Sequence, residues 1–542
     1  MNYRNLVELH RKQTARLGPN VALRFKRDGL YQDLSWDAYR EMALACASAL
    51  IEVGIQPGDR VATFSENRFE WLITDIGILT AGAVNVTPHA PLTAHQVHYE
   101  LDDSDASWIF VSTSSQREKI EQIRQDLPDL EGGVVFDADA RTGGFQSWRA
   151  FLQRGRNALS KNREELTKRE ANLDHDSLAT LMYTSGTTGQ PKGVMLTHGN
   201  LLSNTWSTLQ ISHAGPGDVM LNWLPFSHIY ARTVDHYRGI YAGIPIALAE
   251  SAEALVQNLA EIEPTQISSV PRFYEKVLTL VQSDDEEKTH RRLRNIFGRR
   301  MDYLSSGGAP LPPAIAQVYH DAGLLVLQGY GLTESSPVIS FNQKEDFRIE
   351  TVGRPIPGIE VKIAEDGEVL TKGPHVMKGY WKKPEETAAT IVDGWLHTGD
   401  LGSLDDGFLS ITGRKKELMV LSNGKEVVPA LLENRIVSDP CIDQVVICGE
   451  ARNYLTALVV PDWPQVRAAL EVEETEESVY ALLEERIQKA LADVANWEQV
   501  KKFIVLEKPF TVEAEELTVS LKLRRGIILK RYQEQLDALY TS

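Results

Sequence analysis

Residues 183–193 read YTSGTTGQPKG and combine three glycines, four Ser or Thr hydroxyls and a lysine. Glycines let the backbone turn its N–H groups toward one point, hydroxyls donate to phosphate oxygens, and Lys192 supplies a positive charge. The Walker A spacing G-x-x-x-x-G-K-[ST] is absent, because Pro191 stands where the second glycine would be. The stretch therefore predicts a phosphate-binding loop that differs from the P-loop of NTPases. A plain surface turn rich in Gly and Thr is the alternative.

The bulk properties of the chain predict a protein of several domains. Its 542 residues exceed what a single hydrophobic core usually supports. The formal net charge of −18 argues against a general nucleic-acid binder, because no global positive field is available to neutralise a phosphate backbone. An anionic substrate must therefore meet a locally built site.

Neither a secretory signal nor a membrane span is expected. Residues 1–18 lack the apolar core of a signal peptide, and residues 72–86 are interrupted and too short for a bilayer. Residues 72–86 instead predict a buried helix that leads into a strand. Because Cys46, Cys441 and Cys448 lack metal-ligand spacing, we expect small buried thiols in a reducing cytoplasm.

Helical and strand patterns alternate along the chain. Apolar residues recur at helical spacing over 36–50, and a Gly/Pro turn and a strand follow within 54–67. Alternation of this kind predicts a layered α/β architecture. Further strands are expected at 106–111, 445–448 and 457–461, and further helices at 115–127 and 478–494.

Two polar stretches, 153–177 and 282–301, are interpreted as connectors in the form of solvated helices or loops. The second passes from acidic to basic, and docking to an acidic carrier or an anionic membrane surface is its alternative. The basic residues GRKK at 413–416 are interpreted as a junction. We therefore expect an N-terminal domain over 1–413 and a smaller one over 414–542.

The longer stretch YTSGTTGQPKGVMLTH (183–198) resembles the signature loop of the adenylate-forming superfamily, which includes acyl- and aryl-CoA synthetases, nonribosomal adenylation domains and luciferases. The resemblance implies a large N-terminal domain of layered α/β subdomains and a small mobile C-terminal α+β domain. Seven further motifs follow in the family's order: LPFSHIYART (224–233), SSVPRFYEKV (268–277), SSGGAPLPP (305–313), QGYGLTESSP (328–337), GWLHTGDLG (394–402), GRKKELMVLSNGKEVVP (413–429) and ELTVSLKLRR (516–525).

The resemblance implies an ATP site. Gly307 and Gly308 would let adenine lie against the backbone, and Tyr330 would stack on that ring. Thr333 would bind the α-phosphate, and Glu334 would supply a hard oxygen ligand for Mg²⁺. The implied nucleotide-binding residues are Thr184, Ser185, Gly186, Thr187, Thr188, Gly189, Lys192, Gly307, Gly308, Ala309, Gln328, Gly329, Tyr330, Gly331, Thr333, Glu334, Asp400, Arg414, Gly424, Lys425 and Lys522, with Thr184 and Glu334 on the metal.

Asp400 matches the family's acceptor for the two ribose hydroxyls, and Arg414 matches a second ribose contact. Taken alone, each of these charges is typical of a surface or turn residue. Their assignment to the ribose therefore depends on the ordered motifs.

Four residues are implied in catalysis: Lys522, Glu334, His228 and Lys192. Lys522, with Arg525 after it, matches the C-terminal lysine motif and would neutralise charge while a carboxylate attacks the α-phosphate. By itself, this segment is typical of a basic amphipathic helix. His228 matches a position beside the acyl carboxylate, where it would orient the substrate, because that carboxylate is already ionised at pH 7.

The family's reaction has two steps that share one site. Adenylation replaces a poor leaving group by AMP, and a thiol then displaces the AMP. The C-terminal domain would rotate between the steps about a hinge at Lys416. In one pose Lys522 would face ATP, and in the other the loop with Gly424 and Lys425 would line the passage of the CoA pantetheine thiol.

The motifs are most similar to those of bacterial long-chain fatty acid–CoA ligases. Aromatic residues within 226–230 and 273–274 would wall an alkyl tunnel or would simply be core. Ala231 stands where many long-chain relatives carry an acid, so the chain length of the substrate is left open between medium and long. Also left open are an acyl carrier protein as acceptor, an aryl or other acid as substrate, a catalytically inactive nucleotide- and acyl-binding protein, peripheral membrane contact, and a monomer or a homodimer.

Overall fold

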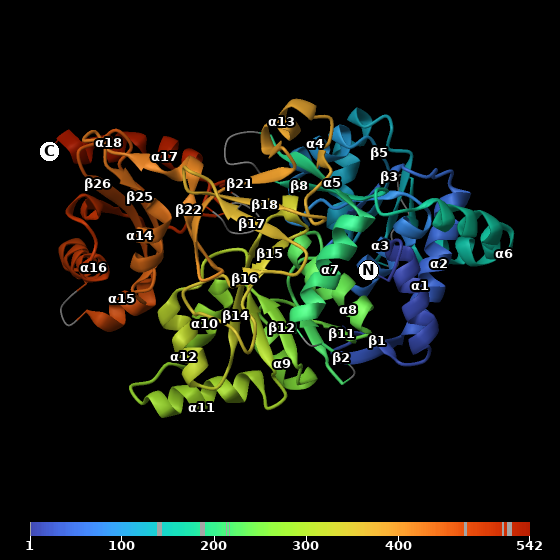
Figure 1. Cartoon of the computed structure of the whole chain (residues 1–542), viewed down its shortest axis with the longest axis horizontal. Helices are drawn as coiled ribbons and strands as arrows, with labels where there is room; N and C mark the ends of the chain where they lie inside the picture. Colours follow the sequence, from blue (N-terminus) through green and yellow to red (C-terminus); the bar gives the residue numbers. More distant parts are fainter. Residues whose placement is uncertain are drawn as a thin grey trace.

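The computed structural model describes residues 2–137, 144–184, 190–212, 214–215, 217–470, 474–511, 514–517 and 523–541 (Figure 1). Two large, mostly parallel sheets lie in its N-terminal three quarters. The first has the strand order β19-β9-β8-β4-β3-β5-β6-β7. Its strands are β3 (Arg60–Phe64), β4 (Val84–Val86), β5 (Ala106–Val111), β6 (Gly132–Val135), β7 (Phe145–Ser147), β8 (Leu178–Thr184), β9 (Lys192–Thr197) and β19 (Gly379–Tyr380).

The second large sheet has the order β16-β15-β14-β13-β12-β10-β11-β1-β2, and β1 and β10 to β14 pair in parallel within it. Its strands are β1 (Val21–Arg27), β2 (Leu30–Ser35), β10 (Met220–Asn222), β11 (Ile246–Leu248), β12 (Gln266–Ser269), β13 (Tyr303–Ser306), β14 (Val326–Gly331), β15 (Val338–Phe341) and β16 (Arg354–Pro355).

Helices pack on these sheets and connect their strands, as the alternating pattern predicts. They are α1 (Leu6–Leu17), α2 (Trp36–Glu52), α3 (Phe69–Thr80), α4 (Ala94–Asp103), α5 (Ser114–Ile123), α6 (Trp148–Asn172), α7 (His198–Ser212), α8 (Arg238–Ala242), α9 (Leu255–Ile262), α10 (Pro271–Val281), α11 (Glu286–Phe297), α12 (Pro313–Asp321) and α13 (Pro384–Thr390).

A third sheet, β17-β18-β21-β20 with β22 beside β21, precedes the C-terminal part, which holds a small hairpin and the sheet β25-β26-β27. The strands are β17 (Glu360–Ile363), β18 (Glu368–Lys372), β20 (Ile391–Val392), β21 (Trp395–Asp405), β22 (Phe408–Arg414), β23 (Met419–Val420), β24 (Glu426–Val427), β25 (Ile442–Cys448), β26 (Leu455–Pro461) and β27 (Val500–Val505). The C-terminal helices are α14 (Pro429–Ile436), α15 (Trp463–Ala469), α16 (Glu476–Ala490), α17 (Arg525–Arg531) and α18 (Gln533–Thr541).

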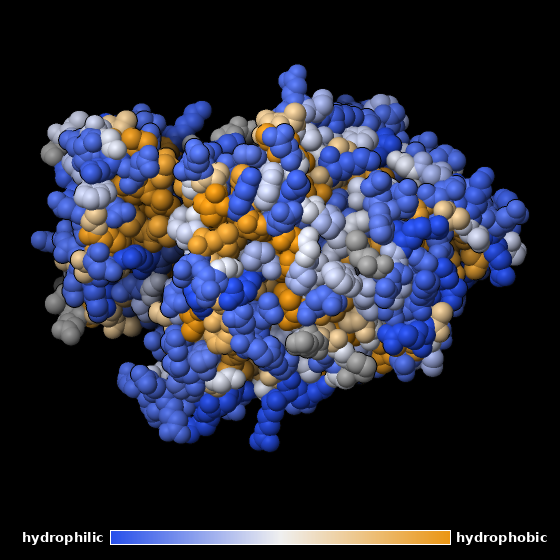
Figure 2. Space-filling view, viewed as in Figure 1, coloured by the Kyte–Doolittle hydropathy of each residue, from blue (hydrophilic) through white to orange (hydrophobic). Residues whose placement is uncertain are grey.

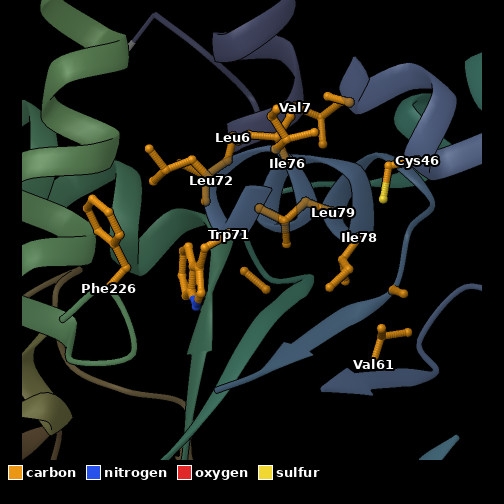
Figure 3. Close-up of a cluster of buried hydrophobic side chains, with 14 of the residues drawn as sticks. Leu6, Val7, Cys46, Val61, Trp71, Leu72, Ile76, Ile78, Leu79 and Phe226 are labelled. Atoms are coloured by element: carbon orange, nitrogen blue, oxygen red, sulfur yellow. The ribbon is translucent and has the colours of Figure 1, made fainter. Parts of the chain in front are cut away.

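The largest core surrounds α3, which with β4 confirms the helix and strand expected over 72–86. In Figure 3, Leu72 of α3 lies toward Leu6 of α1, and Trp71 lies beside Phe226 at a ring separation of 5.4 Å. On the side of α2, a Cβ on Gly77 would lie only 2.7 Å from the Cβ of Cys46. Glycine therefore permits the close approach of these two buried helices.

The helix expected as one form of residues 153–177 is confirmed, but it is a packed helix and not merely a solvated connector. Most of this stretch belongs to α6, which packs along α2 and buries Phe151 and Leu166. A Cβ on Gly155 would lie 1.8 Å from the carbonyl oxygen of Ala45, so the two backbones nearly touch. Hydrophilic side chains cover most of the outer side of α6 (Figure 2), which is why its sequence is typical of a solvated segment.

Residues 282–301 contain α11, which buries Leu293 and Phe297 and is therefore an amphipathic helix on the second sheet's side of the molecule. The C-terminal part has two hydrophobic clusters of its own, drawn from residues 419–536. An ion pair between Arg272 of α10 and Asp443 of β25 joins it to the rest. The exact boundary at residue 413 and the hinge at Lys416 stay predictions.

All three cysteines are buried and unpaired, as expected. Among the described residues, no helix has the length and apolar composition needed to cross a membrane.

Buried histidines make the stability depend on pH. Burial keeps five histidines neutral, and it raises the pKa values of three acids. Between pH 6.5 and about 4 the unfolded chain binds more protons at the five histidines than the folded chain gains at the three acids, so we expect the free energy of unfolding to fall as pH falls. The pKa values are about 3 for His10, 4 for His89, 4 for His198, 4 for His236, 3 for His375, 8 for Glu100 and 6 for Asp235, and burial also raises the pKa of Glu275.

The measurement is the urea midpoint at pH 7 and at pH 5. A midpoint that is equal or higher at pH 5 would contradict the expectation.

Candidate active site

A cavity of about 920 Å³ lies at the carboxyl ends of β8, β13 and β14. Thr184 ends β8, Ser305 and Ser306 end β13, and Gly329 to Gly331 end β14, and all of them line the cavity. Ligands in open α/β sheets bind at this edge, because the loops that leave the strands there form a crevice. The cavity is therefore the candidate active site.

The predicted phosphate loop begins at the edge of this cavity. Thr184 pairs with Lys192 at the open ends of β8 and β9, so the loop joins two antiparallel strands. Ser185, Gly186, Thr187, Thr188 and Gly189 lie outside the described residues. Lys192 forms an ion pair with Glu386 and lies 5.0 Å from the ring centre of Tyr380, and it does not line the cavity.

Glu334 lines the cavity together with Thr333, on a 3₁₀ turn at Thr333–Ser335 that follows β14. Tyr380 donates a hydrogen bond to its Oε1 at 2.9 Å, and burial followed by the charge of Glu334 raises the pKa of Tyr380. The other carboxylate oxygen carries no hydrogen bond from a described residue. No group of three or more His, Cys, Asp or Glu residues that could hold a metal occurs within the described ranges.

A hydrogen-bonded chain joins the predicted base and ribose contacts. Tyr330 donates to Oδ2 of Asp400 at 2.6 Å, and Nε of Arg414 lies 2.9 Å from Oδ1. Burial, and then the carboxylate of Asp400, raises the pKa of Tyr330, so the phenol stays protonated and remains a donor. Asp400 is only 3% exposed, and its two partners hold the carboxylate behind the cavity wall.

Gly307 and Gly308 lie on the cavity wall after β13. A Cβ on Gly307 would lie 3.3 Å from the ring of Tyr230, and Gly308 has a φ of +83°, which favours glycine. The motif therefore keeps this wall flat. Tyr230 also lines the cavity and shares a hydrogen bond of 2.9 Å with the hydroxyl of Ser305.

Four other predicted residues lie away from the cavity. The amide of Gln328 accepts from the backbone of Leu311 and donates to the carbonyl of Ile349, so it ties neighbouring loops together. Ala309 is exposed beyond the glycines. Gly424 and Lys425 belong to the β23–β24 hairpin, where Lys425 lies over the ring of Trp497. Lys522 lies outside the described residues.

His228 lines the cavity at the start of the helical segment 229–242. Its Nδ1 accepts a hydrogen bond of 3.2 Å from the backbone N–H of Tyr230. The ring of His89 stacks with it at 6.3 Å, and Nδ1 of His89 lies 2.8 Å from the hydroxyl of Ser227. Two imidazoles thus face the place where the resemblance implies the acyl carboxylate.

Some of the aromatic residues expected to wall the alkyl tunnel lie in the core, and others line the cavity. Phe226, Phe273 and Tyr274 are buried in hydrophobic clusters and do not line the cavity, so the core alternative holds for them. Tyr230 lines it, and Ile229 does so as well. The apolar part of the wall comes largely from residues outside the motifs: Leu92, Met182, Ile211, Val234, Val338 and Phe341.

The C-terminal part closes one side of the cavity with Leu517, Leu523, Arg524 and Ile527. Arg525, the last residue of the lysine motif, instead donates two hydrogen bonds of 2.7 Å to the carboxylate of Glu433. Its guanidinium therefore fixes α17 to α14, and Arg525 does not line the cavity.

Sequence reasoning missed several cavity residues. Glu417 directly follows the GRKK junction, so its charge beside a motif was an available signal. Tyr380, which positions Glu334, lies 46 residues further along the chain, and no local pattern marks it. Glu100 and Arg238 also line the wall, and both come from segments that the motifs do not cover.

Comparison with protein families gives two matches. Residues 11–381 match the model described as "AMP-binding enzyme", and residues 416–542 match the "AMP-binding enzyme C-terminal domain". Together the two matches cover most of the chain.

Among curated proteins, the chain is 32% identical over 574 aligned residues to the long-chain-fatty-acid–CoA ligase FadD15 of Mycobacterium tuberculosis, covering 95% of this chain and 93% of that protein. Among solved structures it is similar to the ATP-bound MatB of Rhodopseudomonas palustris, at 25% identity and a TM-score of 0.75, over 97% of this chain and 99% of that one. It also shares its fold with the anthranilate CoA ligase AuaEII in complex with anthranoyl-AMP, at 20% identity and a TM-score of 0.80, over 99% and 98%.

Proposed function

The chain belongs to the AMP-binding enzyme family, and from that premise we propose that it is an ATP-dependent fatty acid–CoA ligase that acts on medium- or long-chain acids. One observation carries the proposal. Thr184, His228, Thr333 and Glu334, which come from three separate motifs, line a single cavity that continues into an apolar wall. The similarity to long-chain-fatty-acid–CoA ligases over nearly the whole chain supports the same reaction.

The reaction begins with attack by a carboxylate oxygen of the acid on the α-phosphorus of ATP, and the bond to pyrophosphate breaks. Thr333 binds the α-phosphate, His228 orients the carboxylate, and Lys522 neutralises the charge that moves to the leaving group. The acid is ionised at neutral pH, so no residue has to remove a proton. The thiol sulfur of CoA then attacks the acyl carbon, the thiol proton passes to solvent, and the bond between the acyl carbon and the phosphate oxygen breaks so that AMP leaves.

Glu334, whose second carboxylate oxygen accepts no hydrogen bond from a described residue, and Thr184 both line the cavity and would hold Mg²⁺, which neutralises phosphate charge when it is bound. One or two protein oxygens suit this ion, because it takes most of its remaining ligands from phosphates and water.

The test is AMP release from ATP, Mg²⁺ and CoA with saturated acids from octanoic to octadecanoic. A parallel arm supplies an acyl carrier protein in place of CoA, and another supplies an aryl acid in place of the fatty acid. AMP release that requires both a fatty acid and CoA supports the proposal. The absence of AMP with every fatty acid would overturn it, and faster turnover with the carrier or the aryl acid would reassign the acceptor or the substrate.

Replacing Asp400 by asparagine is expected to raise the KM for ATP by about tenfold or more, because a charge-assisted hydrogen bond contributes about 1.5–3 kcal/mol. The substitution keeps the shape of a side chain that is 3% exposed, but it removes the charge that Tyr330 and Arg414 contact. Steady-state kinetics at varied ATP measure the effect. Asp406→Asn, at an exposed ion pair with Arg348, is the matched control and is expected to leave the KM unchanged.

A further inference from the structure

One face of the helical segment 229–242 points into the cavity. Tyr230, Val234 and Arg238 recur at every fourth residue, and all three line the cavity wall. The middle of this segment, Ala231–Tyr237, is a π-helix, which has more residues per turn than an α-helix. The combination of π-helical and α-helical turns in this segment places every fourth residue on the same side of the helix. The face toward the cavity is therefore continuous from His228 to Arg238.

Arg238 is 2% exposed and has no carboxylate partner among the described residues. Its Nη2 donates to the hydroxyl of Tyr303 at 2.8 Å and to the amide oxygen of Gln266 at 3.0 Å, and both Nη2 and Nε contact the hydroxyl of Ser212. All of these partners are neutral. No described residue accepts a hydrogen bond from Nη1.

The other arginines that are buried within the described ranges have acid partners. Arg232, on the same helical segment, pairs with Asp75, and Arg169 pairs with Glu165. Asp235 lies one turn before Arg238, but its carboxylate accepts hydrogen bonds from Asn222 and Ser268 instead. Burial raises the pKa of Asp235 and the charge of Arg238 acts in the opposite direction, so the two groups interact, but no carboxylate forms an ion pair with Arg238 within the described ranges. Arg238 is therefore a buried charge that faces the cavity without a hydrogen-bonded counter-ion, an arrangement that is costly unless a ligand supplies one.

Arg238 lies at the far end of the cavity from the reacting groups. Arg238 follows His228 by ten positions, which is at most about 15 Å at the 1.5 Å per residue of an α-helix, because the π-helical turns rise less per residue. Ser212 and Tyr303, its hydroxyl partners, line the cavity beside it, and Ile211 and Val234 line the wall on the way. The cavity thus runs from the imidazoles, past apolar side chains, to a cation with hydroxyls around it.

We propose that the acyl site takes acids that carry a second carboxylate at the end remote from the reacting one, and that Nη1 of Arg238 binds this distant carboxylate. The proposal rests on the proposed ligase function and specifies its substrate. An unsubstituted fatty acid would place its methyl end against the guanidinium and leave the buried charge without a partner. A dicarboxylic acid gives this charge an acceptor while its methylene chain contacts the apolar wall.

The experiment compares matched pairs of monocarboxylic and α,ω-dicarboxylic acids of equal length, from eight to sixteen carbons, by acid-dependent AMP formation. For the wild type we expect the kcat/KM of the best diacid to exceed that of its monoacid by at least about tenfold, since a site built for a polar group rejects the analogue that lacks it. Arg238→Met is expected to reverse the order. Arg238→Lys, which keeps the charge, is expected to retain the preference for the diacid.

A second measurement uses only the wild type, so it requires neither catalysis nor a correctly folded variant. Without nucleotide, the diacid is expected to raise the Tm of the wild type more than the monoacid does. The inference is overturned if the wild type prefers the monoacid. It is also overturned if Arg238→Met lowers the rates with the diacid and the monoacid equally, because Arg238 would then only hold α7, β12 and β13 together. If no acid yields AMP, the ligase proposal fails, and the Tm comparison still decides whether Arg238 selects the diacid.

Discussion

Replacing Lys522 by alanine is expected to lower the rate of acyl-adenylate formation at least about 100-fold, because the transition state brings a carboxylate to a triphosphate and needs a cation between them. The position comes from the C-terminal lysine motif, since Lys522 lies outside the described residues. The neighbouring segment supports it, because Leu523, Arg524 and Ile527 line the cavity. The measurement is acid-dependent pyrophosphate exchange.

The second half-reaction supplies the control for this variant. When pre-formed acyl-adenylate is added with CoA, Lys522→Ala is expected to form the thioester at a rate close to that of the wild type, since only the first step needs the cation. Lys530→Ala, at an exposed lysine of α17, is the matched surface variant and is expected to keep both rates. Equal losses in both half-reactions of Lys522→Ala would point to a structural role for the lysine.

Replacing Arg232 by methionine is expected to lower the free energy of unfolding by about 3–5 kcal/mol, because breaking a buried pair leaves an uncompensated charge. Arg232 and Asp75 are both fully buried and form an ion pair. Tyr237 donates to Asp75 at 2.8 Å, and Thr180 accepts from Arg232 at 2.7 Å, so the network joins α3 and β8 to the helical segment beside the cavity. Urea or guanidinium unfolding measures the change.

The matched control is Arg348→Met, at an ion pair with Asp405 and Asp406 on the surface. Exposed pairs contribute about 0–1 kcal/mol, so this variant is expected to unfold nearly as the wild type does. Equal losses for the two variants would contradict the importance of burial. A variant Arg238→Met that is as unstable as Arg232→Met would show that Arg238 is held mainly by its neutral partners.

The ordered motifs were enough to predict the reaction class and part of the cavity wall. Thr184, Gly307, Tyr330 and Glu334 all line one cavity, because short motifs at strand ends carry their own backbone geometry to the edge of the sheet. Their individual roles stay predictions. The sequence was less informative about Gln328, whose amide holds two loops together through partners that no motif contains.

Segments without a motif were predicted less well. Residues 153–177 have the composition of a solvated connector, yet α6 packs tightly on α2 through Gly155. Composition is averaged over all faces of a helix, whereas burial depends on the one face that meets a neighbour. The same limit applies to the aromatic residues, since Phe273 and Tyr230 both belong to motifs but only Tyr230 reaches the cavity.

The sequence by itself determined the family and the alternation of helices and strands, because these depend on residues close together in the chain. It also predicted which residues contact the phosphates and the ribose, and those roles stay predictions. Only the tertiary structure decided what lies at the far end of the acyl site. The partners of Arg238 stand 26, 28 and 65 residues away, on α7, β12 and β13. Whether a buried arginine meets a carboxylate or an open cavity depends on how such distant elements pack, and no local pattern records it.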